Sequence, residues 1–402
     1  MDEHLYTKAI AFSEIILQQN RVEQLRDLSK QLLKKISSLK KGVCVIHGIR
    51  GSGKTTLLTE LYQKEKHTLF VTAEHLLKYG IDLLDFLHYA LAKGHSTYII
   101  DEIHALPTWE KDIKLFYDET KSKIIVSGSS ALALKVKGSE LARRASFYEL
   151  KPLSFREYIL FKTGKRLPQI TLKELLDIQR RQELEQHIRP YIPYFDTYTQ
   201  FDALPAALFE KNPDVYLNIL ERIARFDLTS IQNIDAHYLT AVFQAMKIIS
   251  TSPPGEVSYT GLSSALRTNI KFVREMIYSL SQTGILHLVS PSGRGTSSVR
   301  KEEKILMPLS FRSALCTSYG VAPPKGSIRE DFFVQHVPGS TYLKTGVQRR
   351  TPDFVVQDHI FEVGGPSKGS KQIQGMKNAY LVKEVLTTGE KEIPLYLFGL
   401  LY

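Results

Sequence analysis

The chain has 402 residues, more than one hydrophobic core usually holds, so its length predicts about two to four domains. Hydrophobic residues make up 43% of the sequence and charged residues 24%, which is typical of a soluble globular protein. No stretch approaches the roughly 18 consecutive apolar residues of a membrane-spanning helix. The composition therefore argues against a membrane-spanning protein.

The location of the protein is predicted by elimination. Residues 1–20 carry acidic side chains and lack an apolar run with a cleavage site, so they do not resemble a signal peptide. The two cysteines, Cys44 and Cys316, lie in apolar surroundings, which favours buried reduced thiols over a disulfide. We therefore expect a cytoplasmic protein.

The distribution of charge hints at a polyanionic partner. The formal net charge is +11, and residues 261–402 contribute +7 of it, with 18 Lys and Arg against 11 Asp and Glu. A basic excess in one part of a chain is consistent with nucleic-acid binding. Many soluble proteins are mildly basic without such a partner, so the charge alone does not decide the matter.

Residues 1–41 are expected to form an N-terminal helical segment. Between residues 4 and 39, apolar side chains recur every three to four positions, which is the spacing of an amphipathic helix. Lys and Arg side chains, among them Arg21, Arg26 and Lys30, lie on the other faces and are most simply explained as solvated surface.

Residues 42–153 alternate short apolar runs with helical stretches. Four of the runs are rich in Val, Ile and Tyr, and a fifth leads into a turn. Their nearly continuous apolar character favours strands covered on both faces, as in a parallel α/β sheet. The predicted strands are Val43–His47, Thr68–Val71, Tyr98–Ile100, Lys123–Ser127 and Leu150–Phe155.

A glycine-rich motif follows the first predicted strand and opens a helix. Gly48–Thr55 fits the phosphate-binding pattern Gly-x-x-x-x-Gly-Lys-Ser/Thr, the P-loop. Main-chain N–H groups and the helix N-terminus would surround the phosphates. Lys54 would contact the β- and γ-phosphates, and the Thr55 hydroxyl would bind Mg²⁺. The sequence thus predicts ATP with Mg²⁺, bound by Gly48, Ile49, Arg50, Gly51, Ser52, Gly53, Lys54, Thr55 and Thr56.

An acidic pair ends the third predicted strand. In Tyr98–Glu102, Asp101 would hold the Mg²⁺ shell and Glu102 would orient or deprotonate the attacking water. The alternative is a surface Asp-Glu pair that caps the next helix.

Two further contacts with the nucleotide are expected. Ser127 and Ser129, at the tip of the fourth predicted strand, could touch the γ-phosphate or the water, although a plain Gly/Ser turn explains them nearly as well. Arg144, in the pair Arg143-Arg144, could stabilise charge that develops on the γ-phosphate, within the chain or from a neighbouring subunit. Arginine pairs are also common on plain surfaces.

The middle of the chain is predicted to be helical and then to form a winged helix-turn-helix. Residues 154–234 form helices broken at prolines, and residues 235–310 show helices followed by a hairpin with a Gly/Ser-rich loop. This unit would either bind DNA or dock a protein. Its candidate phosphate contacts are Arg267, Lys271, Arg274, Arg294, Arg300 and Lys301.

Several of these motifs together resemble a known family. The chain resembles the AAA+-type P-loop ATPases of bacteria and archaea that carry a C-terminal restriction-endonuclease-like domain. The similar segments are Ile49–Leu58, Tyr98–Glu110, Val126–Ser130, Leu141–Arg144 and Leu150–Tyr158. The resemblance implies an AAA+ core at 42–153, a helical lid at 154–234, the winged helix, and a nuclease-like domain at 311–402. It also matches Arg144 to the arginine that follows the family's sensor strand. The chain departs from the family in the lid, where it reads Asp202–Pro205 in place of Gly-Gly-Leu-Pro.

The last ninety residues suggest a small α/β domain with a nuclease-like pattern. Helices are expected at Ser327–Val337 and from Lys371, and strands at Tyr342–Lys344, Asp353–Gln357, His359–Val363 and Leu395–Leu400. Two carboxylates on adjacent strands and a lysine are what a Mg²⁺-dependent nuclease needs. The candidate residues are Glu330, Asp353, Glu362, Lys368 and Gln372, with Lys371 as another candidate lysine. Gly364 stands where the pattern has its lysine, so a fold without cleavage is the alternative.

Three functions remain open at this stage. The favoured one is a Mg²⁺-dependent ATPase whose nucleotide state positions a DNA-binding C-terminal half. The others are a slow nucleotide-dependent switch that acts on a protein partner, and an ATP-gated metal-dependent nuclease. An arginine supplied by a neighbouring subunit would require a homo-oligomer.

Overall fold

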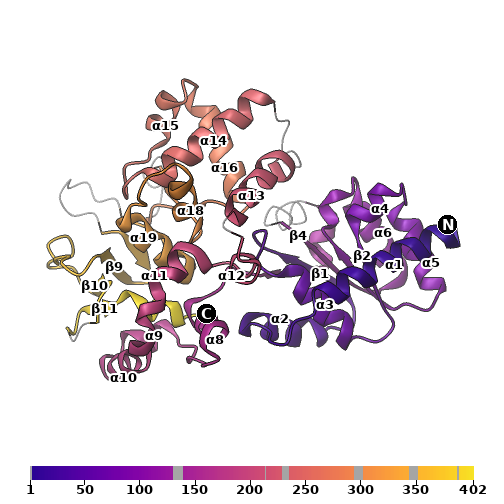
Figure 1. The fold of residues 1–402 in the computed structure, drawn as a ribbon, viewed down its shortest axis with the longest axis horizontal. Helices are drawn as coiled ribbons and strands as arrows, with labels where there is room; N and C mark the ends of the chain where they lie inside the picture. The colour runs from indigo at the N-terminus through magenta and orange to yellow at the C-terminus, as the bar shows by residue number, and fades with distance from the viewer. Residues whose placement is uncertain are drawn as a thin grey trace. The chain divides into compact units, whose positions relative to one another are not determined.

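The computed structural model describes residues 2–129, 139–212, 214–228, 235–293, 302–343, 352–386 and 389–402. The chain divides into two compact units, each shown with its elements in Figure 1. The first unit comprises residues 1–151 and 282–284, and the second unit comprises residues 152–281 and 285–402. The N-terminal helices therefore belong to the same unit as the P-loop core.

The first unit is built on a sheet of five parallel strands in the order β2-β3-β4-β1-β5. This confirms the predicted α/β fold with a parallel sheet. Because all five strands run in the same direction, the loops that follow β1, β3 and β4 lie at one edge of the sheet. The strands are β1 (Gly42–His47), β2 (Thr68–Thr72), β3 (Thr97–Asp101), β4 (Lys123–Gly128) and β5 (Ala145–Glu149).

Helices cover both faces of this sheet. Side chains alternate along a strand, so Val43 and Val45 of β1 join one core cluster while Cys44 and Ile46 join another. Residues of α4, α5 and α6 fill the first cluster, and residues of α2 and α3 fill the second. The helical elements are α1 (Glu3–Gln19), α2 (Asp27–Ser37), α3 (Lys54–Lys64), α4 (Ala73–Lys78), α5 (Leu83–Ala92), η1 (Ile103–Ala105), α6 (Trp109–Thr120) and η2 (Glu140–Arg144).

Two predicted elements of the first unit are wrong in their bounds. The helix expected over residues 4–39 is two helices, because α1 ends at Gln19, where the Asn20 side chain donates to the carbonyl of Ile16. The fifth strand was predicted at Leu150–Phe155, but β5 is Ala145–Glu149 and ends just before that run begins. Pro152 lacks an N–H group, and Ser154 and Glu157 form a capping box that begins α8 (Phe155–Thr163).

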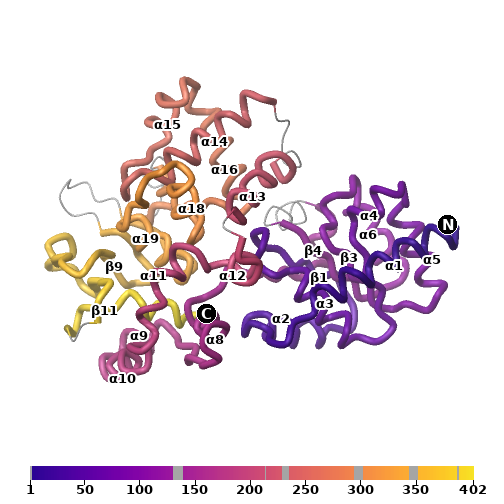
Figure 2. Tube along the Cα trace, in the orientation of Figure 1, coloured from indigo at the N-terminus to yellow at the C-terminus, as the bar shows by residue number. Residues whose placement is uncertain are grey.

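The second unit combines many short helices with two small sheets, and Figure 2 traces its chain path. Its first helices share one core with its C-terminal sheet: Phe155 packs with Phe195, Phe195 packs with Phe332, and Phe333 packs with Phe398. The predicted lid and the predicted nuclease-like domain therefore fold around the same apolar cluster. The early helical elements are α9 (Leu172–Leu176), α10 (Ile178–Ile188), η3 (Arg189–Tyr194), α11 (Phe195–Thr197), η4 (Tyr198–Asp202), α12 (Pro205–Glu210), α13 (Val215–Arg222) and η5 (Ile223–Asp227).

Three helices and an antiparallel pair of strands follow, in the predicted order. They are α14 (Ala236–Thr251), α15 (Tyr259–Ala265), α16 (Ile270–Gln282), β6 (His287–Val289) and β7 (Lys304–Leu306). Most of the loop between the two strands, including Arg294, Arg300 and Lys301, lies outside the described residues.

The C-terminal sheet has four strands in the order β11-β10-β9-β8. β8 pairs antiparallel with β9, and the other neighbours are parallel. The elements of this part are α18 (Phe311–Ser318), α19 (Lys325–His336), β8 (Phe354–Val356), β9 (His359–Gly364), β10 (Ala379–Lys383), β11 (Glu392–Pro394) and η7 (Leu395–Leu400).

Two predictions for this region are wrong. The helix expected from Lys371 is a series of turns, with Gly375 at a φ of 78°. Leu395–Leu400 is a 3₁₀-helix, buried on all sides, and not a strand. A short apolar run that is buried all round cannot be assigned to strand or helix by periodicity.

Both cysteines are buried and free, as expected. Among the described residues, no helix is long and apolar enough to cross a membrane.

Candidate functional site

The phosphate loop joins β1 to α3, and its shape depends on two glycines. The N–H of Leu150 donates to the carbonyl of His47 at 2.7 Å, so the chain after β5 lies directly against the start of the loop. A Cβ atom on Gly48 would lie 2.3 Å from the carbonyl oxygen of Leu150. Gly53, at the N-terminus of α3, has a φ of 92°, which disfavours other residues. Both glycines are therefore required by the backbone.

The Lys54 ammonium group lies inside this loop. Its Nζ atom donates to the carbonyls of Gly48 at 3.0 Å and Ile49 at 3.4 Å, and the side chain is buried. The buried hydroxyl of Ser52 has no hydrogen-bond partner among the described residues. A phosphate oxygen would satisfy that hydroxyl, and the ammonium is placed to meet its charge. The residues present thus fit the triphosphate that the motif implies, and Thr56 follows in the first turn of α3.

Arg26, which was expected on a solvated surface, is buried against the phosphate loop. Its Nη1 atom donates to the carbonyls of Ser52 at 3.2 Å and Lys151 at 2.7 Å. The guanidinium therefore ties the phosphate loop to the segment after β5. Its position just before α2 carried no signal of this role, because the partners are main-chain atoms far away in the sequence.

Asp101 lies at the end of β3, opposite the start of α3. The Thr55 hydroxyl donates to its Oδ2 atom at 2.7 Å, and the Ser127 hydroxyl donates to its Oδ1 atom. Burial, and next the negative charge of Glu102, raise the pKa of Asp101 to about 6. A cation beside this carboxylate would counter both effects, and one carboxylate with one hydroxyl is a usual protein contribution to a Mg²⁺ site that includes phosphate oxygens.

Glu102 follows with a left-handed backbone, at a φ of 51°. Its N–H donates to Asp101 Oδ1 at 3.1 Å and to Ser127 Oγ at 3.2 Å. Its carboxylate faces Arg50 and His104, at 3.9 and 3.3 Å. Asp101 is buried and the side chain of Glu102 is only 21% exposed, so the acidic pair is not a surface helix cap. A strained backbone held by several partners is typical of a functional position.

The structure gives the two predicted sensor serines different surroundings. The Ser127 hydroxyl is bonded to Asp101 and to the backbone of Glu102, so it positions the acidic pair. Ser129 is buried just after β4, and Ser130, which follows it, lies outside the described residues.

Arg144 is not brought to the phosphate loop within the chain. It ends η2, immediately before Ala145, which pairs with Val43 at the start of β1. Its guanidinium donates to both carboxylate oxygens of Asp118, at 2.7 and 2.9 Å. Because the phosphate loop follows the other end of β1, Arg144 lies at the opposite edge of the sheet. A contact with the nucleotide of its own chain is therefore excluded in this conformation.

Two of the predicted nuclease residues, Glu330 and Asp353, come together at a lysine. The Lys304 ammonium lies 3.5 Å from Glu330 Oε2 and 3.3 Å from Asp353 Oδ1. The other oxygen of Asp353 accepts the N–H of Val363 at 2.9 Å. Among the described residues, no three His, Cys, Asp or Glu side chains gather as a metal-binding group. Lys304, which was not predicted for this site, supplies the positive charge beside these two carboxylates.

Lys368 reaches the position that the sequence pattern leaves without a lysine. Its Nζ atom lies 2.6 Å from Glu362 Oε1. A Cβ atom on Gly364 would lie 2.4 Å from Cγ of Lys368, so the lysine stem fills the space beside the glycine. The buried Oε1 atom of Gln372 has no hydrogen-bond partner in the part of the chain that the structure describes.

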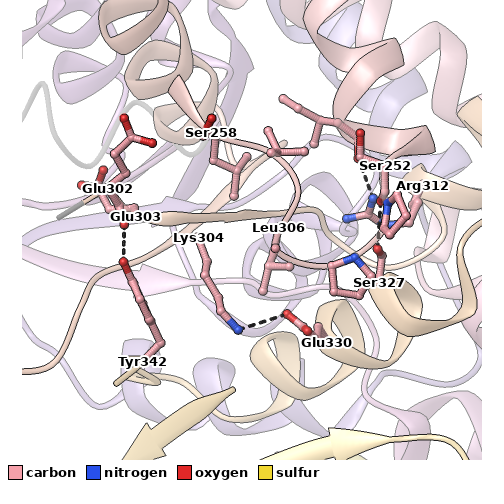
Figure 3. A pocket seen from close by; sticks show the side chains of 16 residues that line it. Ser252, Ser258, Glu302, Glu303, Lys304, Leu306, Arg312, Ser327, Glu330 and Tyr342 are labelled. Atoms are coloured by element: carbon pink, nitrogen blue, oxygen red, sulfur yellow. Dashed lines mark hydrogen bonds and ion pairs between the residues drawn. The ribbon is translucent and has the colours of Figure 1, made fainter. Parts of the chain in front are cut away.

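A cavity of about 270 Å³ adjoins the Lys304–Glu330 pair (Figure 3). It lies between β7, α19 and the turn that follows α14. Lys304 and Glu330 both line it, and their side chains point toward each other. Burial raises the pKa of Glu330 to about 7, although Lys304 acts in the opposite direction. At the other side, Glu303 accepts a hydrogen bond from the Tyr259 hydroxyl at 2.8 Å.

The candidate phosphate contacts on α16 are partly engaged within the chain. Arg274 lies over the ring of Tyr259 and 3.8 Å from Glu302. Lys271 is 85% exposed and pairs only loosely with Glu275, at 3.9 Å. Arg267, just before this helix, has a left-handed backbone with a φ of 52°. Arg267 and Lys271 are both exposed and so are available to a partner.

Comparison with known proteins supports the nucleotide site. Residues 40–159 match the AAA domain family, so the first unit carries an AAA-type P-loop domain. Two uncharacterized proteins of Methanocaldococcus jannaschii are similar in sequence. One is 27% identical over 96% of this chain and 89% of its own length, and the other is 24% identical over 68% of this chain and 60% of its own.

Solved structures resemble the chain only distantly. A STAND-class signal transduction ATPase with a tetratricopeptide repeat sensor from Pyrococcus horikoshii has a TM-score of 0.26 and 16% identity, over 79% of this chain but 45% of its own. The replication initiator DnaA, bound to AMPPCP and single-stranded DNA, has a TM-score of 0.27 and 15% identity. The match covers 66% of this chain and 91% of the DnaA chain. The Hsp104–ADP complex of S. cerevisiae has a TM-score of 0.32 and 14% identity. The match covers 66% of this chain and 40% of the Hsp104 chain. Scores of this size do not establish a common fold over the whole chain.

Proposed function

We propose that this chain, whose first unit contains an AAA-type domain, is a Mg²⁺-dependent ATPase that couples its nucleotide state to the basic second unit. One observation carries the proposal. The hydroxyl of Thr55, at the start of the helix that follows the phosphate loop, donates to Asp101 at 2.7 Å, and Glu102 stands next to it. The groups needed to hold a metal–triphosphate and to activate water are thus assembled in one unit.

Each of these residues has a defined task. Lys54 and the main-chain N–H groups of the loop bind and orient the β- and γ-phosphates. Thr55 and Asp101 would hold Mg²⁺, which neutralises negative charge on the phosphates when it is bound. Glu102 orients the attacking water and accepts its proton. Arg26 keeps the loop in shape through the carbonyl of Ser52.

The decisive experiment measures phosphate release from Mg·ATP by the wild type, Lys54→Ala and Glu102→Gln. We expect saturable turnover in the wild type, loss of binding in Lys54→Ala, and binding without turnover in Glu102→Gln. Tight binding with negligible turnover in the wild type would favour the nucleotide-dependent switch that acts on a protein partner. Absence of saturable binding would overturn both ideas.

For the second unit we propose nucleic acid as the partner. The support is the charge of +7 carried by residues 261–402 and the exposed Lys271. Binding through such residues should weaken steeply with salt, because it releases counterions from the phosphate backbone. A titration of duplex DNA at about 50 and 200 mM salt tests this. Absence of binding at the lower salt would contradict it.

A second candidate function is metal-dependent cleavage of nucleic acid by the second unit. The contact of Lys368 with Glu362 favours it, because it restores the lysine that the sequence pattern lacks. Lys304 opposes it, because its ammonium would have to leave Asp353 before a metal could bind. A cleavage assay with Mn²⁺ should show activity in the wild type that Asp353→Ala and Lys368→Ala both lose. Equal residual cleavage in all three proteins would indicate contamination and end the idea.

A further inference from the structure

The carboxylate of Glu102 lies close to two basic side chains. Its Oε1 atom lies 3.9 Å from Nη1 of Arg50, and its Oε2 atom lies 3.3 Å from Nδ1 of His104. The side chains of Arg50 and His104 are only 12% and 14% exposed, and that of Glu102 is 21% exposed. Solvent and salt screen such sheltered charges less than surface charges, so these two contacts act on the orientation of the carboxylate.

Arg50 connects Glu102 to the phosphate loop, because it is itself a residue of that loop. It stands between Ile49, whose carbonyl accepts a hydrogen bond from Lys54, and Gly51, which has a φ of 79°. Its guanidinium is therefore attached to the segment that a triphosphate would contact. Arg144 does not supply a positive charge at this edge of the sheet, since it is paired with Asp118 at the other edge.

The backbone of Glu102 is fixed, so its side-chain contacts are what can change. Its N–H group is bonded to both Asp101 and Ser127, and the left-handed φ of 51° is maintained by these partners. The Arg50 contact is longer than a hydrogen bond, at 3.9 Å, which makes it the easier of the two carboxylate contacts to exchange.

We propose that Arg50 is a positioning residue that exchanges partners when ATP binds. Without ATP, its guanidinium pairs with Glu102. The γ-phosphate, which carries more negative charge than a carboxylate and is held by Lys54, then takes the guanidinium and releases Glu102 to orient the attacking water. ADP has no γ-phosphate and leaves the Arg50–Glu102 pair intact. This inference rests on the proposed ATPase function and describes its regulation by the substrate.

The exchange predicts an unusual gain of affinity. Glu102→Gln removes the group that competes for the guanidinium, so it should bind ATP about tenfold more tightly than the wild type, while ADP affinity stays unchanged. Arg50→Gln should bind ATP about tenfold more weakly, with a smaller effect on ADP. In the double variant, Glu102→Gln should give no gain. Arg180→Gln, an exposed arginine of α10 paired with Glu183, is the matched control and should change neither affinity.

The measurement is competition of ATP and of ADP against a fluorescent nucleotide, with Mg²⁺, on the full chain. Thermal melting of each variant checks that it is folded, and Glu102→Gln alone still tests the exchange if Arg50→Gln does not fold. An unchanged ratio of ATP to ADP affinity in Glu102→Gln would overturn the inference. The same gain from Glu102→Gln with and without Arg50 would overturn it too. If the wild type binds no nucleotide, the proposed function fails first. If the wild type binds and hydrolyses ATP but these ratios stay constant, only the role of Arg50 is wrong.

Discussion

Each unit of the protein contains a buried carboxylate, Asp101 in the first and Glu330 in the second, and the two have different partners. In the first unit, Asp101 accepts hydrogen bonds from the hydroxyls of Thr55 and Ser127. In the second unit, Glu330 and Asp353 share the ammonium group of Lys304.

The two sites differ in the charge of these partners. Asp101 is hydrogen-bonded to neutral hydroxyl groups, whereas Glu330 and Asp353 are paired with an ammonium group. Hydroxyl groups orient a carboxylate but do not neutralise it, so burial and Glu102 still raise the pKa of Asp101 to about 6. An ammonium group supplies the positive charge within the chain. Similar acidic residues therefore favour Mg²⁺ binding in the first unit and self-neutralisation in the second.

The largest expected effect is on turnover. Asp101→Asn keeps the shape of the side chain but removes the charge that would hold Mg²⁺, so kcat should fall by about 1,000-fold, or about 4 kcal/mol. Phosphate release under saturating ATP and Mg²⁺ measures it. Asp118→Asn, at the opposite edge of the same sheet, is the matched control. Equal losses in the two variants would show that the acidic pair has no special place in the reaction.

The next effect is on stability. Lys304→Met leaves Glu330 and Asp353 buried without their cation, so the free energy of unfolding should fall by roughly 3 kcal/mol near neutral pH. The loss should be smaller at pH 5 than at pH 8. Burial already raises the pKa of Glu330 to about 7, so the folded state favours the protonated acid, and stability decreases as the pH rises toward and through this value. Lys304 itself lowers the pKa of Glu330, so this pKa rises when Lys304 is removed. Stability then continues to decrease up to a higher pH.

Thermal melting of Lys304→Met at pH 5 and 8 checks this, with Lys271→Met at an 85% exposed position as the control. A melting temperature equal to that of the wild type at both pH values would show that the second carboxylate pair does not depend on Lys304.

A moderate effect is expected beneath the phosphate loop. Arg26→Ala removes the donor that joins the carbonyls of Ser52 and Lys151, so the loop loses one of its constraints. ATP affinity should fall about tenfold, which corresponds to one charged hydrogen bond. Arg21→Ala, on the exposed segment nearby, should bind ATP normally. The fluorescent competition titration that measures ATP affinity distinguishes them, and equal affinities would remove Arg26 from the site.

The smallest effect is expected at the opposite edge of the sheet. Arg144→Gln breaks the partly exposed pair with Asp118 and should lower the melting temperature slightly, without changing ATP turnover at low protein concentration. If Arg144 acts on a neighbouring subunit, turnover of the wild type should rise with protein concentration and that of Arg144→Gln should not. A large loss of turnover at low concentration would contradict the position of Arg144.

Local patterns predicted much of the first unit. The apolar runs of β1 to β4, the phosphate loop and the acidic pair are each specified by neighbouring residues, and the structure places Thr55 and Asp101 in contact. The predictions failed where the partners are far away in the sequence. Arg26 was taken for a surface residue because its acceptors are main-chain atoms near residues 52 and 151.

The second unit was harder to predict for the same reason. Lys304 sits on β7 and meets Glu330 and Asp353 from two other elements, which no spacing along the chain could indicate. The apolar run Leu395–Leu400 is buried on all sides, so its sequence does not distinguish a strand from a 3₁₀-helix. Lys368 was among the candidates, but only the space beside Gly364 shows how it reaches Glu362.

Equilibrium dialysis of the purified chain against radiolabelled ATP tests the central claim most directly, with Mg²⁺ in one arm and a chelator in the other. The account predicts saturable uptake of about one nucleotide per chain, strengthened by Mg²⁺ and abolished by Lys54→Ala. Uptake that does not saturate, or that is the same in Lys54→Ala as in the wild type, would contradict it.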